Sequence, residues 1–181
     1  MEQEKAYIRI FLADLDKYNE GIVKGDWIEL DNKFDLSVEL KRLDIKTEYL
    51  VADYESNLKN IKVAEYCSAT ELRQFGEIVT FINDAFLELE VADVIIYQAG
   101  LDYAWSVFKF EKYRVLDLTG YSNVSNNDEK LGYYLTDESG MLNDLPDEIS
   151  TYFDYEYYGR DYRIAGNGDF TESGNFYVEL M

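Results

Sequence analysis

The stretch from residue 131 to residue 163 limits the possible structures of this chain more strongly than any other. It reads LGYYLTDESGMLNDLPDEISTYFDYEYYGRDYR, with eight carboxylates, two arginines, seven tyrosines and no lysine. A solvated helix face more often alternates Glu with Lys four residues apart, because each such pair adds a few tenths of a kcal/mol. The stretch therefore predicts an acidic surface that lysines do not neutralise, lying on a layer of aromatic side chains.

The charge imbalance extends over the whole chain. Its 181 residues include 37 acidic and 17 basic side chains, a formal net charge of -20. A net charge of about 2 to 8 suffices to keep a small domain soluble, and larger values destabilise the compact state by self-repulsion. A hydrophobic content of 47% and an aromatic content of 16% exclude a disordered acidic tail. We therefore expect no direct contact with nucleic acid or an anionic membrane, and a cationic partner.

Several kinds of chemistry are excluded by residue type. The chain has no histidine, which removes Ser-His and Cys-His nucleophiles and His-ligated metals, and its lone Cys67 cannot form an internal disulfide. Carboxylate pairs such as Asp14 with Asp16, or Asp154 with Glu156, are the remaining catalytic possibility, as in glycoside hydrolysis. With 37 acidic residues such pairs arise by chance. We predict a protein that is not an enzyme and needs no metal or cofactor.

The first residues of the chain, its hydropathy and its cysteine content indicate a cellular compartment. The start, MEQEKAYIRI, has no basic region followed by an apolar one, and no apolar run reaches the roughly 18 residues that span a bilayer. A single cysteine is typical of a reducing compartment. A cytoplasmic protein is expected.

The residue patterns predict an α+β fold. Residues 6–12, 26–30 and 47–54 read as strands of a small antiparallel sheet, with a short helix favoured near residues 34–43. Ser68 and Glu71 form a capping box, followed by Leu72, Phe75, Val79, Ile82 and Phe86 at helical spacing. A second helix is expected over residues 88–97 and ends near Gly100.

The remaining chain predicts a second mixed region. Residues 105–118 alternate as a strand, residues 120–127 read as a polar loop, and a helix starts near Asn127 or Asp128. Pro146 suits the first turn of another helix, with Ile149, Tyr152 and Phe153 on its buried face. The tail, residues 165–180, reads as a loose hairpin. We predict three domains: 1–61, α+β; 62–103, helical; and 104–181, α+β and the most acidic.

Three interpretations of the acidity stay open on composition alone. The surface can imitate DNA, whose duplex presents one negative charge per roughly 1.7 Å of axis to a basic groove. It can instead belong to an acidic module that binds a basic protein without imitating DNA. It can also be an adaptation to salt or for solubility.

Two runs of residues resemble a known family. Asp14, Leu15, Tyr18, Asn19, Glu20 and Gly21, followed by Gly25 and Trp27, resemble the opening of the ArdA antirestriction proteins. The run from Tyr152 to Asp161, YFDYEYYGRD, resembles that family's later signature, and LGYYLTDESGMLNDLP resembles its antirestriction motif. These runs lie at both ends of the chain.

The resemblance implies a DNA-mimic inhibitor of type I restriction-modification enzymes, carried on plasmids or conjugative transposons. Family members are elongated, curved, three-domain homodimers joined through the C-terminal domain. They occupy the DNA groove of the methyltransferase core, with no bond broken and no cofactor required.

On this basis we assign two sets of residues to function. The expected DNA-mimic surface comprises carboxylates from the last two predicted domains: Glu65, Glu71, Glu77, Asp84, Glu88, Asp128, Glu129, Asp137, Glu138, Asp144, Asp147, Glu148, Asp154, Glu156 and Asp161. The expected dimer interface comprises four aromatic residues: Trp105, Phe108, Phe110 and Tyr133.

Overall fold

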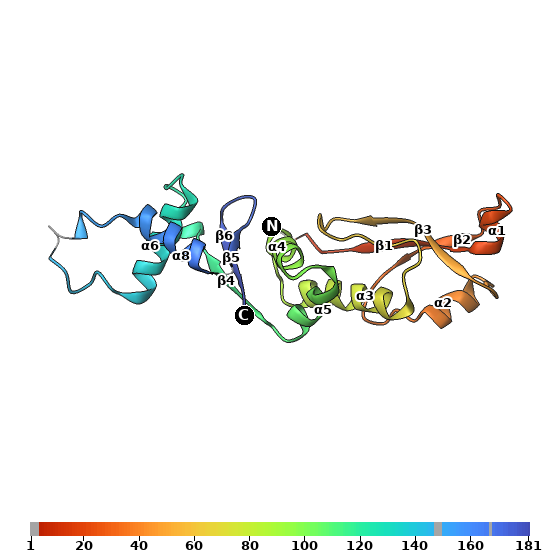
Figure 1. Cartoon of the computed structure of the whole chain (residues 1–181). Helices are drawn as coiled ribbons and strands as arrows, with labels where there is room; N and C mark the ends of the chain where they lie inside the picture. The colour runs from red at the N-terminus through yellow and green to blue at the C-terminus, as the bar shows by residue number, and fades with distance from the viewer. Residues whose placement is uncertain (1–3, 147–149, 167) are drawn as a thin grey trace. The chain divides into compact units, whose positions relative to one another are not determined.

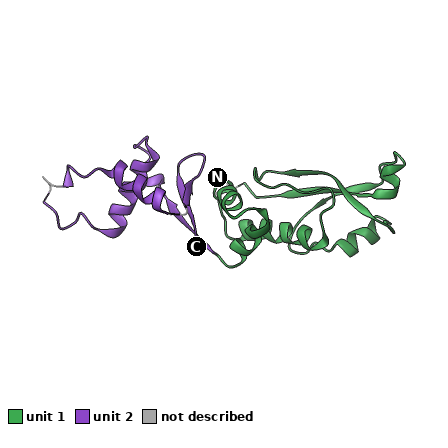
Figure 2. Cartoon of the chain, in the orientation of Figure 1, with its two compact units in different colours: residues 1–111 green, residues 112–181 purple. Residues whose placement is uncertain are grey.

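The structure is a computed structural model that describes residues 4–146, 150–166 and 168–181. Its contacts divide the chain into two compact units, residues 1–111 and residues 112–181 (Figure 2). Each unit combines helices with one small antiparallel sheet (Figure 1), which confirms the predicted α+β class. The finer division into domains 1–61, 62–103 and 104–181 stays a prediction.

The first unit is built on a three-stranded sheet. Strands β1 (Ile8–Asp14), β2 (Gly25–Glu29) and β3 (Tyr49–Ser56) lie in the order β2-β1-β3, all antiparallel. Ile8, Ile10 and Leu12 alternate along β1 and are fully buried, as the two-residue period of a half-buried strand requires. The short helices α1 (Leu15–Asn19) and α2 (Leu36–Arg42) join these strands. The predicted three-stranded sheet with a helix near residues 34–43 is confirmed.

Three helices complete the first unit. They are α3 (Ala69–Asp84), α4 (Leu89–Ala99) and α5 (Leu101–Lys109). The capping box is present: the Ser68 hydroxyl accepts from the Glu71 N–H, and the Glu71 carboxylate accepts from the Ser68 N–H. The side chain of Asn83 bonds both the N–H and the C=O of Ala6, which fixes α3 beside β1.

Two predictions for this unit are wrong. Residues 105–109 belong to helix α5, and only Tyr113–Asp117 form a strand, β4, in the second unit. The buried residues of α5, Ala104, Val107 and Phe108, have helical spacing, and the alternation of residues 107–110 imitated a strand. Phe86 is 77% exposed, because α3 ends two residues earlier.

The second unit has its own sheet and core. Strands β4, β5 (Gly168–Phe170) and β6 (Phe176–Leu180) lie in the order β4-β6-β5, so the predicted C-terminal hairpin is confirmed. The sheet packs against α6 (Asn127–Ser139), and a 3-10 turn, η1 (Thr119–Tyr121), precedes that helix. The core is formed by buried residues of the sheet, of α6 and of the position just before η1: Leu116, Leu118, Leu131 and Tyr177.

Two glycines bring α6 close to the last helix, α8 (Tyr155–Ala165). A Cβ atom on Gly132 would lie closer than 3.0 Å to the Tyr155 carbonyl oxygen, and one on Gly159 would lie as close to the Asp128 carbonyl oxygen. The backbones of the two helices are therefore in direct contact where they cross, and only glycine, which has no side chain, permits such a close approach. The sequence patterns did not predict α8.

The helix predicted to start at Pro146 includes Asp147, Glu148 and Ile149, which lie outside the described residues. Tyr152, expected on its buried face, is 88% exposed. None of the helices in the described part of the chain is long and apolar enough to cross a membrane.

Candidate acidic interaction surface

Six exposed carboxylates lie on the helices of the second unit and on the segment between them. We call them the acidic surface; they come from α6, α8 and the segment between: Asp137, Glu138, Asp144, Asp154, Glu156 and Asp161. All six were predicted as site residues. Asp147 and Glu148, predicted beside them, lie outside the described residues.

The nearby basic side chains are engaged with groups other than these six carboxylates. Arg163 binds Asp128 with two of its three guanidinium nitrogens, Nε to Oδ1 at 2.7 Å and Nη2 to Oδ2 at 3.0 Å. The guanidinium of Arg160 lies over the Tyr157 ring, 5.0 Å from its centroid. Lys130 is buried, and its Nζ donates to the Gly174 carbonyl at 3.3 Å. Among the residues that the structure describes, no salt bridge joins the acidic surface to a lysine or arginine.

Capping residues determine where the two helices that carry the acidic surface begin and where α6 ends. Asn126 caps α6 by accepting from the N–H groups of Asp128 and Glu129, and Gly140 ends it with a left-handed φ of 63°. Asp154 caps α8 by accepting from the Tyr157 N–H at 2.8 Å. Asp154 thus has a structural task as well as a charge.

A ladder of aromatic rings supports the last turn of α6. Tyr121 stacks on Tyr133 with centroids 6.0 Å apart, and Tyr133 stacks on Tyr155 at 3.9 Å. The Tyr121 hydroxyl donates to Asp137 Oδ2 at 2.6 Å. Burial, and then the neighbouring Asp137 carboxylate, raise the pKa of Tyr121 to about 12, so the hydroxyl is a permanent donor at neutral pH. The predicted aromatic layer beneath the charges is present here.

Tyr121 is the residue of this surface that sequence reasoning missed. It lies in a stretch predicted to be a polar loop, 16 residues before Asp137. No helical or strand period relates the two positions. The tyrosine itself, in an otherwise polar loop, was the one available signal.

Other predicted carboxylates of the second unit are less available. Asp128 is held by Arg163, and this hydrogen bond raises the pKa of the Arg163 guanidinium. Glu129 is half-buried in the first turn of α6. The structure therefore separates both from the exposed acidic surface.

The carboxylates predicted in the helical part of the first unit divide into two groups. Glu71 belongs to the capping box, and the Ser68 hydrogen bonds lower its pKa. Glu77 accepts from Trp105 Nε1 and lies 3.5 Å from Arg73 Nε. Glu71 is exposed although it is held in the capping box, and the other three, Glu65, Asp84 and Glu88, are exposed as well.

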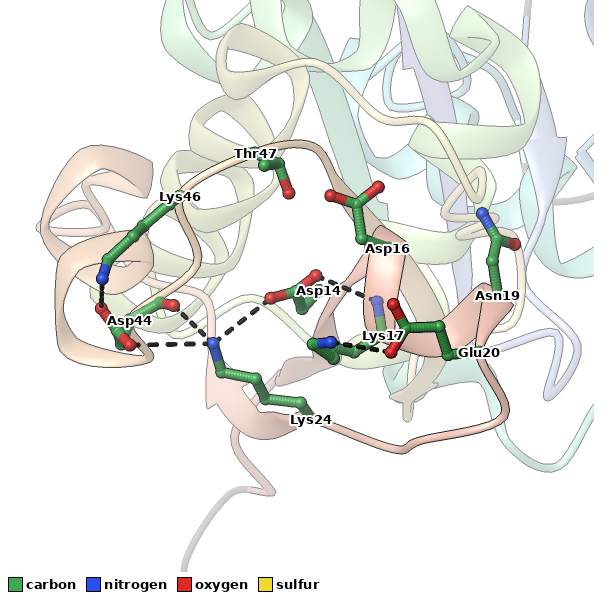
Figure 3. A pocket seen from close by; sticks show the side chains of 9 residues that line it. All are labelled: Asp14, Asp16, Lys17, Asn19, Glu20, Lys24, Asp44, Lys46 and Thr47. Atoms are coloured by element: carbon green, nitrogen blue, oxygen red, sulfur yellow. Dashed lines mark hydrogen bonds and ion pairs between the residues drawn. The ribbon is translucent and has the colours of Figure 1, made fainter.

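Basic residues of the N-terminal sheet are largely engaged in local ion pairs. Figure 3 shows a pocket in which Lys24 Nζ contacts Asp14 Oδ2 at 3.3 Å and the carbonyl of Asp44. In the same pocket Lys46 pairs with Asp44, and Lys17 pairs with Glu20. These lysines therefore neutralise their own neighbours.

The first family-like run has a structural explanation at this pocket. Asp14 is buried and caps α1 by accepting from the Lys17 N–H, which is the main cause of its lowered pKa. Gly21 turns the chain with φ 78°, and a Cβ on Gly25 would collide with the Leu12 carbonyl of β1. Trp27 packs edge-on against Phe11. These residues build the β1–β2 connection.

The predicted interface aromatics occupy different environments. Phe108 is buried inside the first unit, and Trp105 is half-buried with Lys109 Nζ over its ring at 4.3 Å. Phe110 is 59% exposed. Tyr133 is the middle ring of the ladder in the second unit. Their role in a dimer stays a prediction.

The fold and this surface define an acidic α+β protein with a supported array of exposed carboxylates. Within the described ranges no group of three or more acidic or cysteine side chains is placed to hold a metal ion. A family model described as antirestriction protein (ArdA) matches residues 10–177, and the chain therefore belongs to the ArdA family, as its motifs indicated. No curated protein sequence matches the chain significantly. Membership implies an antirestriction function and interaction with restriction-modification enzymes.

Proposed function

We propose that this protein inhibits type I restriction-modification enzymes by imitating B-form DNA. Its carboxylates occupy the basic groove of the methyltransferase core in place of phosphates, one inhibitor against one groove, and no reaction is catalysed. The proposal includes the homodimer through residues 104–181 that the family resemblance implies.

The observation that carries the proposal is the absence of counter-ions. In the described residues, the six carboxylates of the acidic surface form no salt bridge, while Arg160 and Arg163 are engaged elsewhere. A surface selected for stability would pair these charges, since each exposed pair adds up to about 1 kcal/mol. Unpaired carboxylates are instead available to the lysines and arginines of a partner.

The position of two carboxylates supports the same conclusion. Asp137 and Glu138 lie in the last turn of α6, which contains no basic residue. The negative end of the helix dipole disfavours an acidic side chain there by about 0.3 to 1 kcal/mol. Keeping acidic residues at this locally unfavourable position is understandable if the charge serves binding.

The first unit adds to the mimic in this proposal. Glu65, Asp84 and Glu88 extend the exposed charge on its helical part. The lysines near β1 and β2 reduce the local negative charge by pairing with Asp14, Asp44 and Glu20. We therefore expect a smaller contribution from the N-terminal sheet than from the acidic surface.

Neutralising the acidic surface tests the proposal. A variant with four changes, Asp137→Asn, Glu138→Gln, Glu156→Gln and Asp161→Asn, should lose about 1 to 4 kcal/mol of binding to a type I methyltransferase core, at 0.2 to 1 kcal/mol for each exposed contact. Inhibition is measured by titration of the enzyme with the variant and the natural chain.

A control variant makes the same change in net charge on the first unit: Asp16→Asn, Glu48→Gln, Asp53→Asn and Asp102→Asn, at four exposed positions. It should retain more inhibition than the first variant. Equal inhibition by the natural chain and the first variant would contradict the proposal. Binding that leaves DNA in place would instead indicate an acidic module for a basic partner without DNA mimicry.

A further inference from the structure

We propose that Tyr121 is a positioning residue that holds Asp137 in one orientation, and that Asp137 is in consequence the anchoring carboxylate of the acidic surface. This inference rests on the proposed function and deepens it. It predicts that Asp137 contributes more to the binding free energy than each of the other carboxylates of the acidic surface.

The first step is the contact itself. The Tyr121 hydroxyl donates to Asp137 Oδ2 at 2.6 Å, a short distance typical of a hydrogen bond to a charged acceptor. Asp137 is exposed at the C-terminal end of α6, whereas Tyr121 is half-buried at the end of η1. The bond therefore joins a surface carboxylate to a side chain that is anchored below it.

The second step is the anchorage of Tyr121. Its ring stacks on Tyr133 with planes 14° apart, and Tyr133 stacks in turn on Tyr155 of α8. Its backbone N–H donates to the carbonyl of Leu118, a fully buried core residue. The hydroxyl is thus fixed by two helices and by the core of the second unit.

The third step is the contrast with the neighbouring charges. In the part of the chain that the structure describes, no side-chain hydrogen bond holds Glu138, Glu156 or Asp161, and Asp154 accepts from a backbone N–H of its own helix, not from an anchored side chain. A side chain that is already fixed loses less conformational entropy when a partner binds it. An ionised carboxylate has about four acceptor positions, so Asp137 can still accept from an arginine or lysine.

Four full-length variants and one double variant test the inference. Tyr121→Phe removes the hydroxyl and keeps the ring in the stack, whereas Tyr133→Phe does the same for the neighbouring ring without touching Asp137. Asp137→Asn is matched by Glu138→Gln, which makes the same change in charge one residue later. Affinity for a purified type I methyltransferase core is measured for each, and thermal unfolding shows that each is folded.

The inference predicts that Tyr121→Phe weakens binding about 2- to 12-fold, the effect of losing one pre-fixed side chain. Tyr133→Phe should bind as the natural chain does, and Asp137→Asn should lose more affinity than Glu138→Gln. Combined with Asp137→Asn, the Tyr121→Phe change should cause no further loss, because its effect passes through that carboxylate.

Three results would overturn it. If Tyr121→Phe binds as tightly as the natural chain, Asp137 needs no positioning, although the proposed function stands. If Tyr121→Phe weakens binding equally with and without Asp137→Asn, Tyr121 acts on the fold alone. If the natural chain itself does not bind the core, the proposed function fails together with this inference.

Discussion

Replacing Gly132 by alanine should loosen the crossing of α6 and α8. The new Cβ would lie 1.9 Å from the carbonyl oxygen of Tyr155 and 2.7 Å from its carbonyl carbon. Both are backbone atoms, so no side-chain rotation relieves the collision and the helices must separate. Tyr155 also carries the ring that stacks on Tyr133, so the aromatic ladder would shift with it.

The magnitude follows from two opposing effects. Overpacking in a tight site costs about 1 to 3 kcal/mol. Alanine in place of glycine inside a helix returns about 0.5 to 1 kcal/mol. We therefore expect Gly132→Ala to lower the free energy of unfolding of the second unit by up to about 2.5 kcal/mol. For a region of this size each kcal/mol corresponds to roughly 4 to 8 °C in Tm.

The two units can be followed separately in one experiment. Both tryptophans, Trp27 and Trp105, lie in the first unit, so tryptophan fluorescence reports that unit. The tyrosine ladder lies in the second unit, and near-UV circular dichroism reports the packing of its rings. Urea unfolding of Gly132→Ala should shift the tyrosine signal to lower urea and leave the tryptophan signal in place.

Gly120→Ala is the matched control. Gly120 lies in the same unit, its φ is not in the left-handed region, and a Cβ there would meet no atom within 4 Å. Its stability should stay within about 0.5 kcal/mol of the natural chain. If Gly132→Ala were as stable as Gly120→Ala, the close helix crossing would not exist as described.

Two further predictions concern ionisable groups. Arg163→Gln should destabilise the second unit by about 1 to 3 kcal/mol in urea unfolding, because it leaves the half-buried Asp128 without its partner. Arg160→Gln, which removes only a contact with the Tyr157 ring, should cost less than about 1 kcal/mol. Equal effects of the two changes would refute the pairing of Arg163 with Asp128. The pKa values of Tyr121 and Tyr177 are raised to about 12 from about 10 in an unfolded chain. Each protonated phenol therefore contributes fully to the free energy of unfolding below about pH 10, and this contribution is lost as pH rises through 12. Ultraviolet titration of Tyr121→Phe should show one late phenol fewer than the natural chain; the same number of late phenols in both would refute the assignment.

Local signals in the sequence predicted much of the fold. The alternation of Ile8, Ile10 and Leu12 indicated a half-buried strand, and Ser68 with Glu71 marked the start of α3 to the residue. Such signals work because strand period and helix capping depend on residues only a few positions apart.

Predictions failed where neighbours in space decide the structure. Residues 105–109 alternate like a strand, but the buried positions of α5 pack against α3 and α4 and make it a helix. Helix α8 went unpredicted because its buried position is Gly159, which offers no apolar side chain to count. Both depend on packing partners that are distant in the sequence.

The candidate site shows the same division. The carboxylates of the acidic surface were predicted from composition, and their exposure follows from their chemistry. The pairing of Asp128 with Arg163 spans 35 residues, and the Tyr121 contact with Asp137 spans 16. No periodic pattern contains these contacts, so only the structure distinguishes an engaged carboxylate from an available one.

The central claim is that this chain takes the place of DNA on its target. The most direct measurement is displacement of a labelled duplex from a purified type I methyltransferase core, titrated with this protein at two salt concentrations. The account predicts displacement at near-equimolar protein that weakens as salt rises, because the contacts are electrostatic. A folded protein that leaves the duplex bound to a competent enzyme at both salt concentrations would contradict it.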